Sequence, residues 1–104
     1  HCLLFQRSGD VGLGIPFNIA SYGLLTHLIA KTCDLEAYEL VHIIGNAHIY
    51  EEHIDVLKEQ LNNKCYDFPK IRILEKKEID EYKLDDIEIE DYKYSNKINM
   101  KMKV

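Results

Sequence analysis

The sequence has 104 residues, of which 46% are hydrophobic and 30% charged, with a formal net charge of −5 at pH 7; these values fit one small folded domain or part of one. The acidic balance argues against DNA as a partner, since phosphate neutralisation requires a basic face, and no stretch reaches the roughly 20 apolar residues that cross a membrane. Three cysteines without CxxC spacing argue against a disulfide framework and a zinc site, so a soluble protein of the reducing, cytoplasmic compartment is expected.

The first third of the chain predicts a strand, a turn and a helix. Residues Cys2 to Phe5 are apolar and polar residues 6–10 follow, which is typical of a buried strand that ends in a polar turn. Three glycines between positions 9 and 14 predict a flexible loop, and Asn18 is a plausible N-cap for a helix over 19–33. This helix is apolar nearly all round, which indicates a place inside a larger protein.

The rest of the sequence predicts strands, one helix and an arm. A nearly apolar strand is expected over 39–45 and an amphipathic helix over 51–63. Residues 70–74 alternate as a strand does, and so do residues 87–89 within an acidic, solvated stretch. The tail 98–104 alternates apolar side chains with Lys and Asn, as in a short final strand or a docking arm.

Polar residues at the end of the first strand are candidates for an anion site. Arg7 offers a planar fork of donors and Ser8 adds a hydroxyl, both of which suit phosphate oxygens. The alternative is a surface ion pair between Arg7 and Asp10 in a tight turn. Asn18 likewise has two interpretations, a helix cap or an amide that reads a pyrimidine edge through its donor and its acceptor.

The histidines do not predict a metal site. His42, His48 and His53 are six and five residues apart, which does not match the i, i+4 spacing of a helical zinc site, so no metal is expected. His48 and Tyr50 share a face if the segment is extended, and both can hydrogen-bond a sugar hydroxyl. His42, in an apolar strand, is interpreted as a satisfied core residue. No cysteine has the cationic neighbour that activates a thiolate.

Three strings of the sequence resemble thymidylate synthases. The longest is Gln-Arg-Ser-Gly-Asp-Val-Gly-Leu-Gly-Ile-Pro-Phe-Asn-Ile-Ala-Ser-Tyr at 6–22, followed in family order by 45–54 and Phe68-Pro69-Lys70, with a Met-rich end. The resemblance covers the entire chain and identifies residues 1–104 as the carboxyl-terminal part of the family's catalytic domain. It implies an α/β (α+β) fold, the thymidylate synthase fold, in which a mixed β-sheet packs with helices and this chain is a fragment of a larger domain.

The resemblance also implies an activity. Family members methylate dUMP to dTMP reductively, with 5,10-methylenetetrahydrofolate as one-carbon and hydride donor. Their nucleophile is a cysteine in a Pro-Cys-His motif, which would lie upstream of His1, so this chain alone is expected to lack it. The expected partners are dUMP, methylenetetrahydrofolate, the rest of the synthase polypeptide and a second subunit of a homodimer. Asn46 and a Lys-rich composition resemble protozoan members, which favours a fused dihydrofolate reductase domain as well.

The family's site residues carry over onto matching positions. Those implied for dUMP are Arg7, Ser8, Gly9, Asp10, Asn18, His48, Ile49 and Tyr50. Those implied for the folate are Asp10, Gly14, Phe17 and Lys103. The phosphate would bind Arg7 and Ser8, the uracil edge Asn18, and the deoxyribose 3′-hydroxyl His48 and Tyr50.

Asp10 would accept a hydrogen bond from the pterin ring, Gly14 would allow close approach of the ligands, and Phe17 would pack on the folate. The carboxyl-terminal residues would close over the folate and exclude water. The basic ending leaves the role of Lys103 open, because the common ending of the family is apolar.

Two alternatives stay open. A pyrimidine nucleotide hydroxymethylase on the same scaffold would use cytosine nucleotides and is expected to carry aspartate where Asn18 stands, so Asn18 argues against it. A noncatalytic nucleotide-binding fragment or degenerate copy is suggested only by the absence of the nucleophile. An upstream Pro-Cys-His motif would exclude that second alternative.

Overall fold

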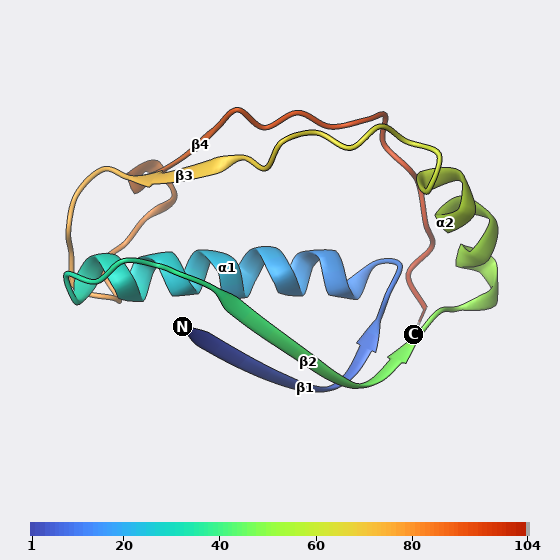
Figure 1. Ribbon diagram of the computed structural model, residues 1–104, viewed down its shortest axis with the longest axis horizontal. Coiled ribbons are helices and arrows are strands. Elements are labelled where there is room, and N and C mark those ends of the chain that lie inside the picture. Colours follow the sequence, from blue (N-terminus) through green and yellow to red (C-terminus); the bar gives the residue numbers. More distant parts are fainter. Residues whose placement is uncertain (104) are drawn as a thin grey trace.

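Two parallel strands and the helix that connects them form the main layer of the computed structural model, which describes residues 1–103 (Figure 1). Strands β1 (Cys2–Asp10) and β2 (Leu40–His48) pair in parallel from their first residues to their last. Helix α1 (Gly14–Thr32) forms the crossover between them and packs against both. Because the strands are parallel, their carboxyl ends meet at one edge.

β1 is longer than its apolar run predicts. The strand continues through polar residues 6–10 because these pair with β2 as far as His48. The predicted turn at 6–10 is therefore wrong, and the turn lies at residues 11–13. Hydrogen bonds to β2 extend β1 here, and a local sequence pattern cannot show such a long-range partner.

Helix α1 also begins earlier than predicted, at Gly14 instead of residue 19. Its N-cap residue is Leu13, which makes no side-chain cap hydrogen bond, and Pro16 lies in the first turn, where a missing N–H costs no helical bond. Asn18 is thus inside the helix, and its prediction as the N-cap is wrong.

The end of α1 is a Schellman motif with an aspartate in the left-handed position. Asp34 has φ of +56°, and the N–H groups of Asp34 and Leu35 donate to the carbonyl oxygens of Lys31 and Ala30 at 3.4 and 2.8 Å. Glycine is the usual residue at this position, and Asp is among the few others that adopt it readily.

The second half of the chain follows the predicted order with shorter elements. The predicted helix over 51–63 is a 3-10 turn, η1 (Glu51–His53), that continues as α2 (Ile54–Gln60). β3 (Lys70–Ile73) and β4 (Ile87–Glu90) pair antiparallel after a further turn, η2 (Leu84–Asp86), which confirms both predicted strands.

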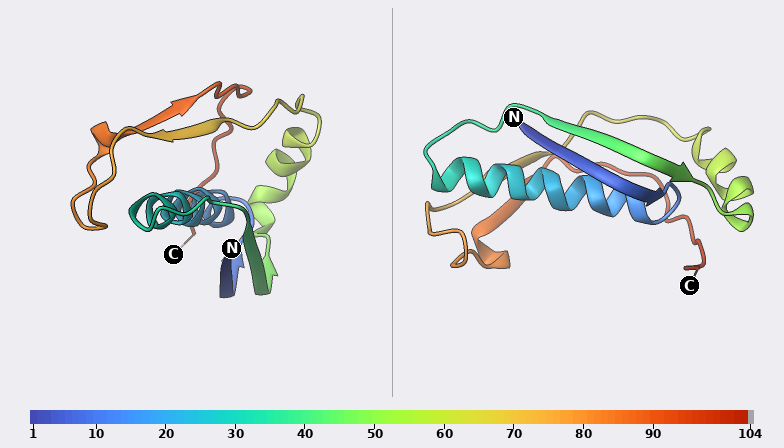
Figure 2. Two further views of the ribbon diagram at one scale, coloured as in Figure 1. Left: turned by 60° about the vertical axis from the view of Figure 1, so that its left-hand side comes forward. Right: turned by 90° about the horizontal axis from the view of Figure 1, so that it is seen from below.

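The tail forms no strand within the described residues and runs as an extended arm past α2, back towards the carboxyl ends of β1 and β2 (Figure 1). Helix α1 lies between the β1–β2 pair and the β3–β4 pair (Figure 2). The architecture is thus a mixture of helices and small sheets, as the predicted α+β class requires.

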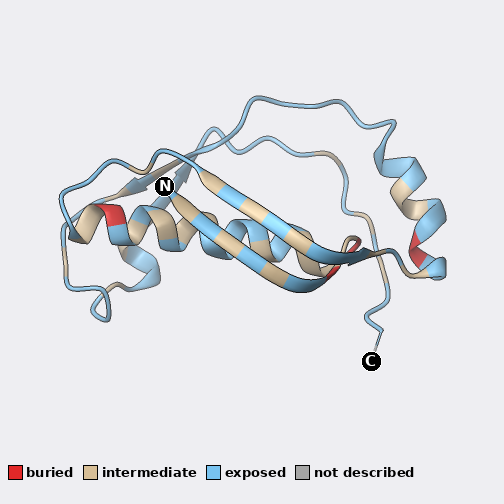
Figure 3. Cartoon of the chain, turned by 60° about the horizontal axis from the view of Figure 1, so that its bottom comes forward, coloured by how far each residue is buried: buried red, intermediate tan, exposed pale blue. Residues whose placement is uncertain are grey.

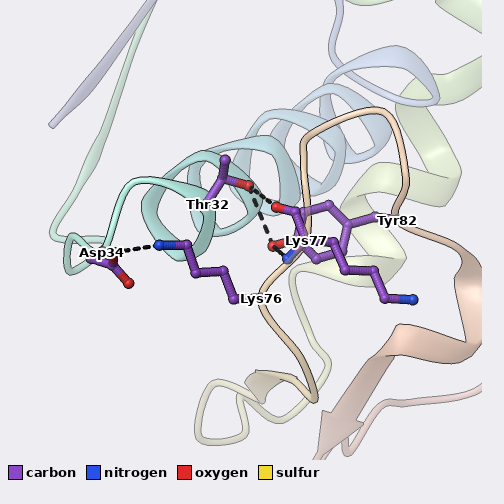
Figure 4. A network of polar contacts seen from close by, with 5 residues as sticks. All are labelled: Thr32, Asp34, Lys76, Lys77 and Tyr82. Atoms are coloured by element: carbon purple, nitrogen blue, oxygen red, sulfur yellow. Dashed lines mark hydrogen bonds and ion pairs between the residues drawn. The ribbon is translucent and has the colours of Figure 1, made fainter.

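A cluster of polar contacts ties the segment before β4 to the end of α1 (Figure 4). The Thr32 hydroxyl donates to the Lys77 carbonyl oxygen at 2.9 Å and lies 3.3 Å from the Tyr82 hydroxyl. The Lys77 backbone N–H donates to the same Tyr82 oxygen at 3.1 Å, and Lys76 pairs with Asp34. The acidic stretch is therefore an ordered part of the fold.

Little of the apolar surface is covered (Figure 3). Among the described hydrophobic residues only Ala30 is buried, with 8% of its surface exposed. The register places Leu3 beside Val41 and Phe5 beside Ile43, and all four are exposed, by 67, 40, 69 and 45%. We call these four residues the outer face of the β1–β2 pair. The expectation of a buried strand over residues 2–5, and of a second one covered on both faces over residues 39–45, is therefore wrong for this chain, because α1 covers only one face of the pair. None of the helices in the described part has the length and apolarity needed to cross a membrane.

Candidate functional site

The predicted site residues converge where β1 and β2 end. Ser8, Gly9 and Asp10 pair with Asn46, Ala47 and His48, and the Val11 N–H donates to the His48 carbonyl oxygen at 2.9 Å. The first turn of α1 starts four residues after β1. Two sequence strings that are nearly 40 positions apart therefore form one edge, which is where ligands bind in open parallel sheets.

The phosphate candidates are accessible at this edge. Arg7 and Ser8 are both exposed, and within residues 1–103 the Arg7 guanidinium has no ion pair or side-chain hydrogen bond. The alternative of an ion pair between Arg7 and Asp10 is therefore wrong. A Cβ at Gly45 would lie 3.0 Å from the Arg7 carbonyl oxygen, so glycine lets β2 approach β1 closely at this level. The Arg7 side chain is left available for an anion.

One oxygen of the Asp10 carboxylate is bonded to the chain, and the other has no partner within residues 1–103. Its Oδ1 accepts the Gly12 N–H at 3.1 Å and lies 3.8 Å from Nδ1 of His53. Oδ2 has no hydrogen-bond partner in the described part of the chain, and the side chain is 21% exposed. A carboxylate in this arrangement can accept a hydrogen bond from the N–H of a ligand ring.

Asn18 is oriented by Gln6 of β1, and Gln6 is in turn held by His42 of β2. Gln6 Nε2 lies 2.8 Å from the Ser8 carbonyl oxygen, which only accepts, so that Gln6 atom is the donating nitrogen. The same nitrogen donates to Asn18 Oδ1 at 3.1 Å, and Gln6 Oε1 faces His42 Nε2 at 2.8 Å. His42 therefore donates through Nε2, which confirms that its ring is satisfied, but it is only half-buried, so the prediction that it is a core residue is wrong. The chain of bonds fixes which end of the Asn18 amide is oxygen and leaves its NH₂ group as a donor.

The segment after β2 presents two rings on one side. His48 and Tyr50 lie edge to face with centroids 5.4 Å apart, which confirms that they share a face. Nδ1 of His48 lies 3.2 Å from Oδ1 of Asn46. Ile49, between the two rings, is 51% exposed. Imidazole and phenol groups are thus placed together beside Asp10.

The residues predicted for the folate fall into two groups. Gly14 is close to the edge, because a Cβ there would lie 3.4 Å from Asp10 Cβ, and Phe17 is 72% exposed on the next turn of α1. Phe17 and Met100 help to line a cavity of about 580 Å³ between α1, α2 and the tail. This cavity is not lined by Arg7 or Asn18, so it adjoins the strand edge without including the predicted phosphate and pyrimidine positions.

Lys103 lies apart from these residues, on Glu52. Its ammonium forms an ion pair with the Glu52 carboxylate, and this hydrogen bond holds the pKa of Glu52 below its usual value. The described tail is thereby attached to η1. A contact between Lys103 and a folate stays a prediction.

Comparison with known proteins decides the family. The thymidylate synthase family model matches residues 1–104. The chain belongs to the thymidylate synthase family. It is 56% identical to thymidylate synthase of Saccharomyces cerevisiae and 52% identical to that of Homo sapiens, over 99% of this chain and 34% and 33% of those proteins. It is 50% identical to bifunctional dihydrofolate reductase-thymidylate synthase 2 of Arabidopsis thaliana, over 99% of this chain and 18% of that protein. The chain thus spans about a third or less of the length of these relatives.

Membership of the thymidylate synthase family confirms the resemblance seen in residues 6–22.

The three cysteines show no sign of an activated thiolate. Cys2 is half-buried, Cys33 and Cys65 are exposed, and none forms a disulfide. None of the three has a hydrogen-bonded base or an ion-pair partner in the described part of the chain. Within the same residues no cluster of His, Cys, Asp and Glu could hold a metal ion.

Two residues of this chain were not predicted as part of the site. Gln6 was assigned only to the polar turn, although it orients Asn18. His53 was considered only as a metal ligand, although it is the most buried side chain described, at 1% exposure. A glutamine directly before Arg7 and a histidine one helical turn after Tyr50 are the only sequence signals, and neither indicates burial.

Proposed function

We propose that this chain is the carboxyl-terminal part of a thymidylate synthase catalytic domain and that the whole protein methylates dUMP to dTMP with 5,10-methylenetetrahydrofolate. The observation that carries the proposal is the pairing of Ser8 and Asp10 with Asn46 and His48, which brings the implied phosphate, folate and deoxyribose residues to one edge. Membership of the family supports the same reaction.

In this proposal dUMP lies across the ends of both strands. Arg7 and Ser8 donate to its phosphate, and the unpaired Arg7 guanidinium supports this role. Asn18 reads uracil, because its NH₂ group donates to O4 while its oxygen accepts from N3–H. His48 and Tyr50 hold the 3′-hydroxyl, and Gly9 and Ile49 supply backbone beside the nucleotide.

In this proposal the folate lies beside Asp10 at the strand ends and extends into the adjoining cavity that Phe17 helps to line. The free Oδ2 of Asp10 accepts from the pterin, and the exposed ring of Phe17 packs on the cosubstrate beside Gly14. When bound, methylenetetrahydrofolate supplies the one-carbon unit and the hydride. This chain's contribution is to orient both ligands and to exclude water, with the tail closing over the site.

The rest of the machinery is proposed to come from outside this chain. The nucleophilic cysteine is expected upstream of His1, where the nearby Arg7 guanidinium would favour its thiolate form. A second subunit of a homodimer and a fused dihydrofolate reductase domain are the further partners that we propose. The apolar outer face of the β1–β2 pair supports a larger assembly, since an exposed patch of this kind marks an interaction surface.

A substrate-selectivity experiment on the full-length polypeptide tests the proposal. We expect the wild type to convert dUMP to dTMP in the presence of methylenetetrahydrofolate and to form a covalent complex with 5-fluoro-dUMP, detected by intact mass. Asn18→Asp replaces the donor to O4 with an acceptor, so kcat/KM for dUMP should fall about ten- to a hundredfold and the preference should move towards dCMP.

Asn62→Asp is the matched control, because this exposed amide at the end of α2 contacts only the Lys58 carbonyl oxygen, at 3.5 Å. It should leave both substrates unchanged. A wild type that prefers dCMP would instead identify a hydroxymethylase. A wild type that binds dUMP without turnover or adduct would identify a noncatalytic copy.

A further inference from the structure

His53 lies where three separate segments of the chain meet. Its ring is 1% exposed and contacts the turn after β1 as well as the carboxyl-terminal tail. A Cβ added to Gly12 would lie 2.6 Å from His53 Nδ1 and 3.1 Å from Met100 Sδ. The ring and the Met100 side chain therefore fill the space that Gly12 leaves open.

The hydrogen bonds of the ring define where its proton is. Nε2 lies 2.7 Å from the Lys101 carbonyl oxygen, which only accepts, so Nε2 carries the hydrogen. Nδ1 is buried without a hydrogen-bond partner in the described residues and faces Asp10 Oδ1 at 3.8 Å. His53 is thus bonded to the tail on one side and directed at the Asp10 carboxylate on the other.

The same ring adjoins the residues proposed for the deoxyribose. The Tyr50 ring meets it edge to face at 5.7 Å, and the His53 backbone N–H donates to the Tyr50 carbonyl oxygen at 2.9 Å. Tyr50 in turn contacts His48. His53 thus lies next to Asp10, Tyr50 and the tail at once.

We propose that His53 is a positioning residue that holds residues 100–103 against the end of β1 through its Nε2–H bond to the Lys101 carbonyl. This inference rests on the proposed function, since it makes closure of the tail over the folate depend on a ring that also faces the folate-binding carboxylate. His53 itself touches neither ligand. Its effect should fall on the folate and the tail and spare dUMP.

Two substitutions separate the Nε2–H bond from the mere presence of a side chain. Glutamine places its amide nitrogen where Nε2 lies and keeps the donor to Lys101, whereas asparagine reaches only the Nδ1 position. In the full-length polypeptide, His53→Asn should raise the KM for methylenetetrahydrofolate roughly three- to tenfold, the loss expected for one hydrogen bond, and leave the KM for dUMP within about twofold. His53→Gln should restore the KM for the folate to near the wild-type value.

Limited digestion with trypsin supplies a second measurement that does not require activity. Cleavage after Lys101 should be faster in His53→Asn than in the wild type or in His53→Gln, because the tail is then no longer held. Gly12→Ala, which displaces the ring by a separate route, should also accelerate this cleavage. His27→Asn, at an exposed position of α1, is the matched control and should change neither cleavage nor kinetics.

The outcomes distinguish this inference from the proposed function. Unchanged cleavage after Lys101 in His53→Asn would overturn the role of His53, whatever the activity of the wild type. Equal damage in the Gln and Asn variants, or parallel loss of dUMP and folate binding, would also overturn it. An inactive wild type with the expected cleavage pattern would refute the proposed reaction and retain the positioning role.

Discussion

At the scale of single residues, the site depends on side chains that orient other side chains. Asn18 can distinguish uracil from cytosine only if its amide is held in one orientation, and Gln6 provides that hold with help from His42. Gln6 is the only described residue that bonds to Asn18 through its side chain. The selectivity that we propose for Asn18 therefore depends on its neighbour.

Gln6→Glu tests this dependence. A carboxylate still accepts from His42 but cannot donate to Asn18 Oδ1, so the Asn18 amide loses its fixed orientation. We expect the KM for dUMP in the full-length polypeptide to rise roughly five- to tenfold, since one hydrogen bond contributes about 1 kcal/mol, and discrimination against dCMP to weaken.

Asn62→Asp, also a change from amide to carboxylate, is the matched control for that experiment. The exposed Asn62 side chain contacts only the Lys58 carbonyl oxygen, at 3.5 Å, and does not line the cavity. It should leave the KM for dUMP unchanged. Equal KM values in Gln6→Glu and the wild type would show that Asn18 is oriented by other means.

The family string predicted which residues are candidates for this site, but the sequence predicted little of how deeply they are buried. The string 6–22 indicated Arg7, Asp10 and Asn18 without any structure. The role of His53 could not be predicted, because its burial comes from Gly12 and a tail segment nearly 50 positions away. The prediction of Asn18 as an N-cap was wrong for the same reason, because its side chain bonds to Gln6 on β1 and not to its own helix.

At the scale of elements, the acidic segment between β3 and β4 is held by specific pairs. Lys77 donates to Asp86 at 2.8 Å, and both side chains are mostly shielded, with 26 and 15% exposure. Asp86 also accepts the Lys83 backbone N–H at 2.7 Å, which caps η2. Charge density predicted only a solvated face here, because a local pattern does not show which charges pair.

This pair makes stability depend on pH in a defined direction. The hydrogen bond from Lys77 holds the pKa of Asp86 below its ordinary value of 3.8. A carboxyl group with a lowered folded-state pKa contributes stability above its ordinary pKa and loses that contribution as the pH falls through the folded value. In urea unfolding of the full-length polypeptide, Asp86→Asn should be less stable than the wild type near pH 6, and the difference should shrink as the pH falls below 3.8.

Asp85→Asn provides the comparison for that measurement. Asp85 is the neighbouring exposed carboxylate and has no ion pair among the described residues. Its difference from the wild type should stay nearly constant over the same pH range. A constant difference for Asp86→Asn as well would mean that the pair with Lys77 does not stabilise the fold.

At the scale of the whole molecule, the chain is too open to stabilise itself. It exposes 8681 Å², whereas a compact protein of this mass exposes about 6,100 Å². Its radius of gyration is 15.8 Å, against about 13 Å for a compact chain of this length. The apolar helix predicted this result in part, because its pattern already indicated a larger protein.

The outer face allows a direct test of this openness. Expressed alone, the 104-residue chain should bind a hydrophobic dye, associate in sedimentation experiments and unfold without a cooperative transition, because hydrophobic burial is the main favourable term in folding. Phe5→Lys should reduce association of the isolated chain, since it breaks the apolar face that Phe5 forms with Ile43. In the full-length polypeptide the same substitution should be strongly destabilising, because a covered site would then hold an unpaired charge. A monomeric isolated chain with a sharp transition would show that the outer face needs no cover.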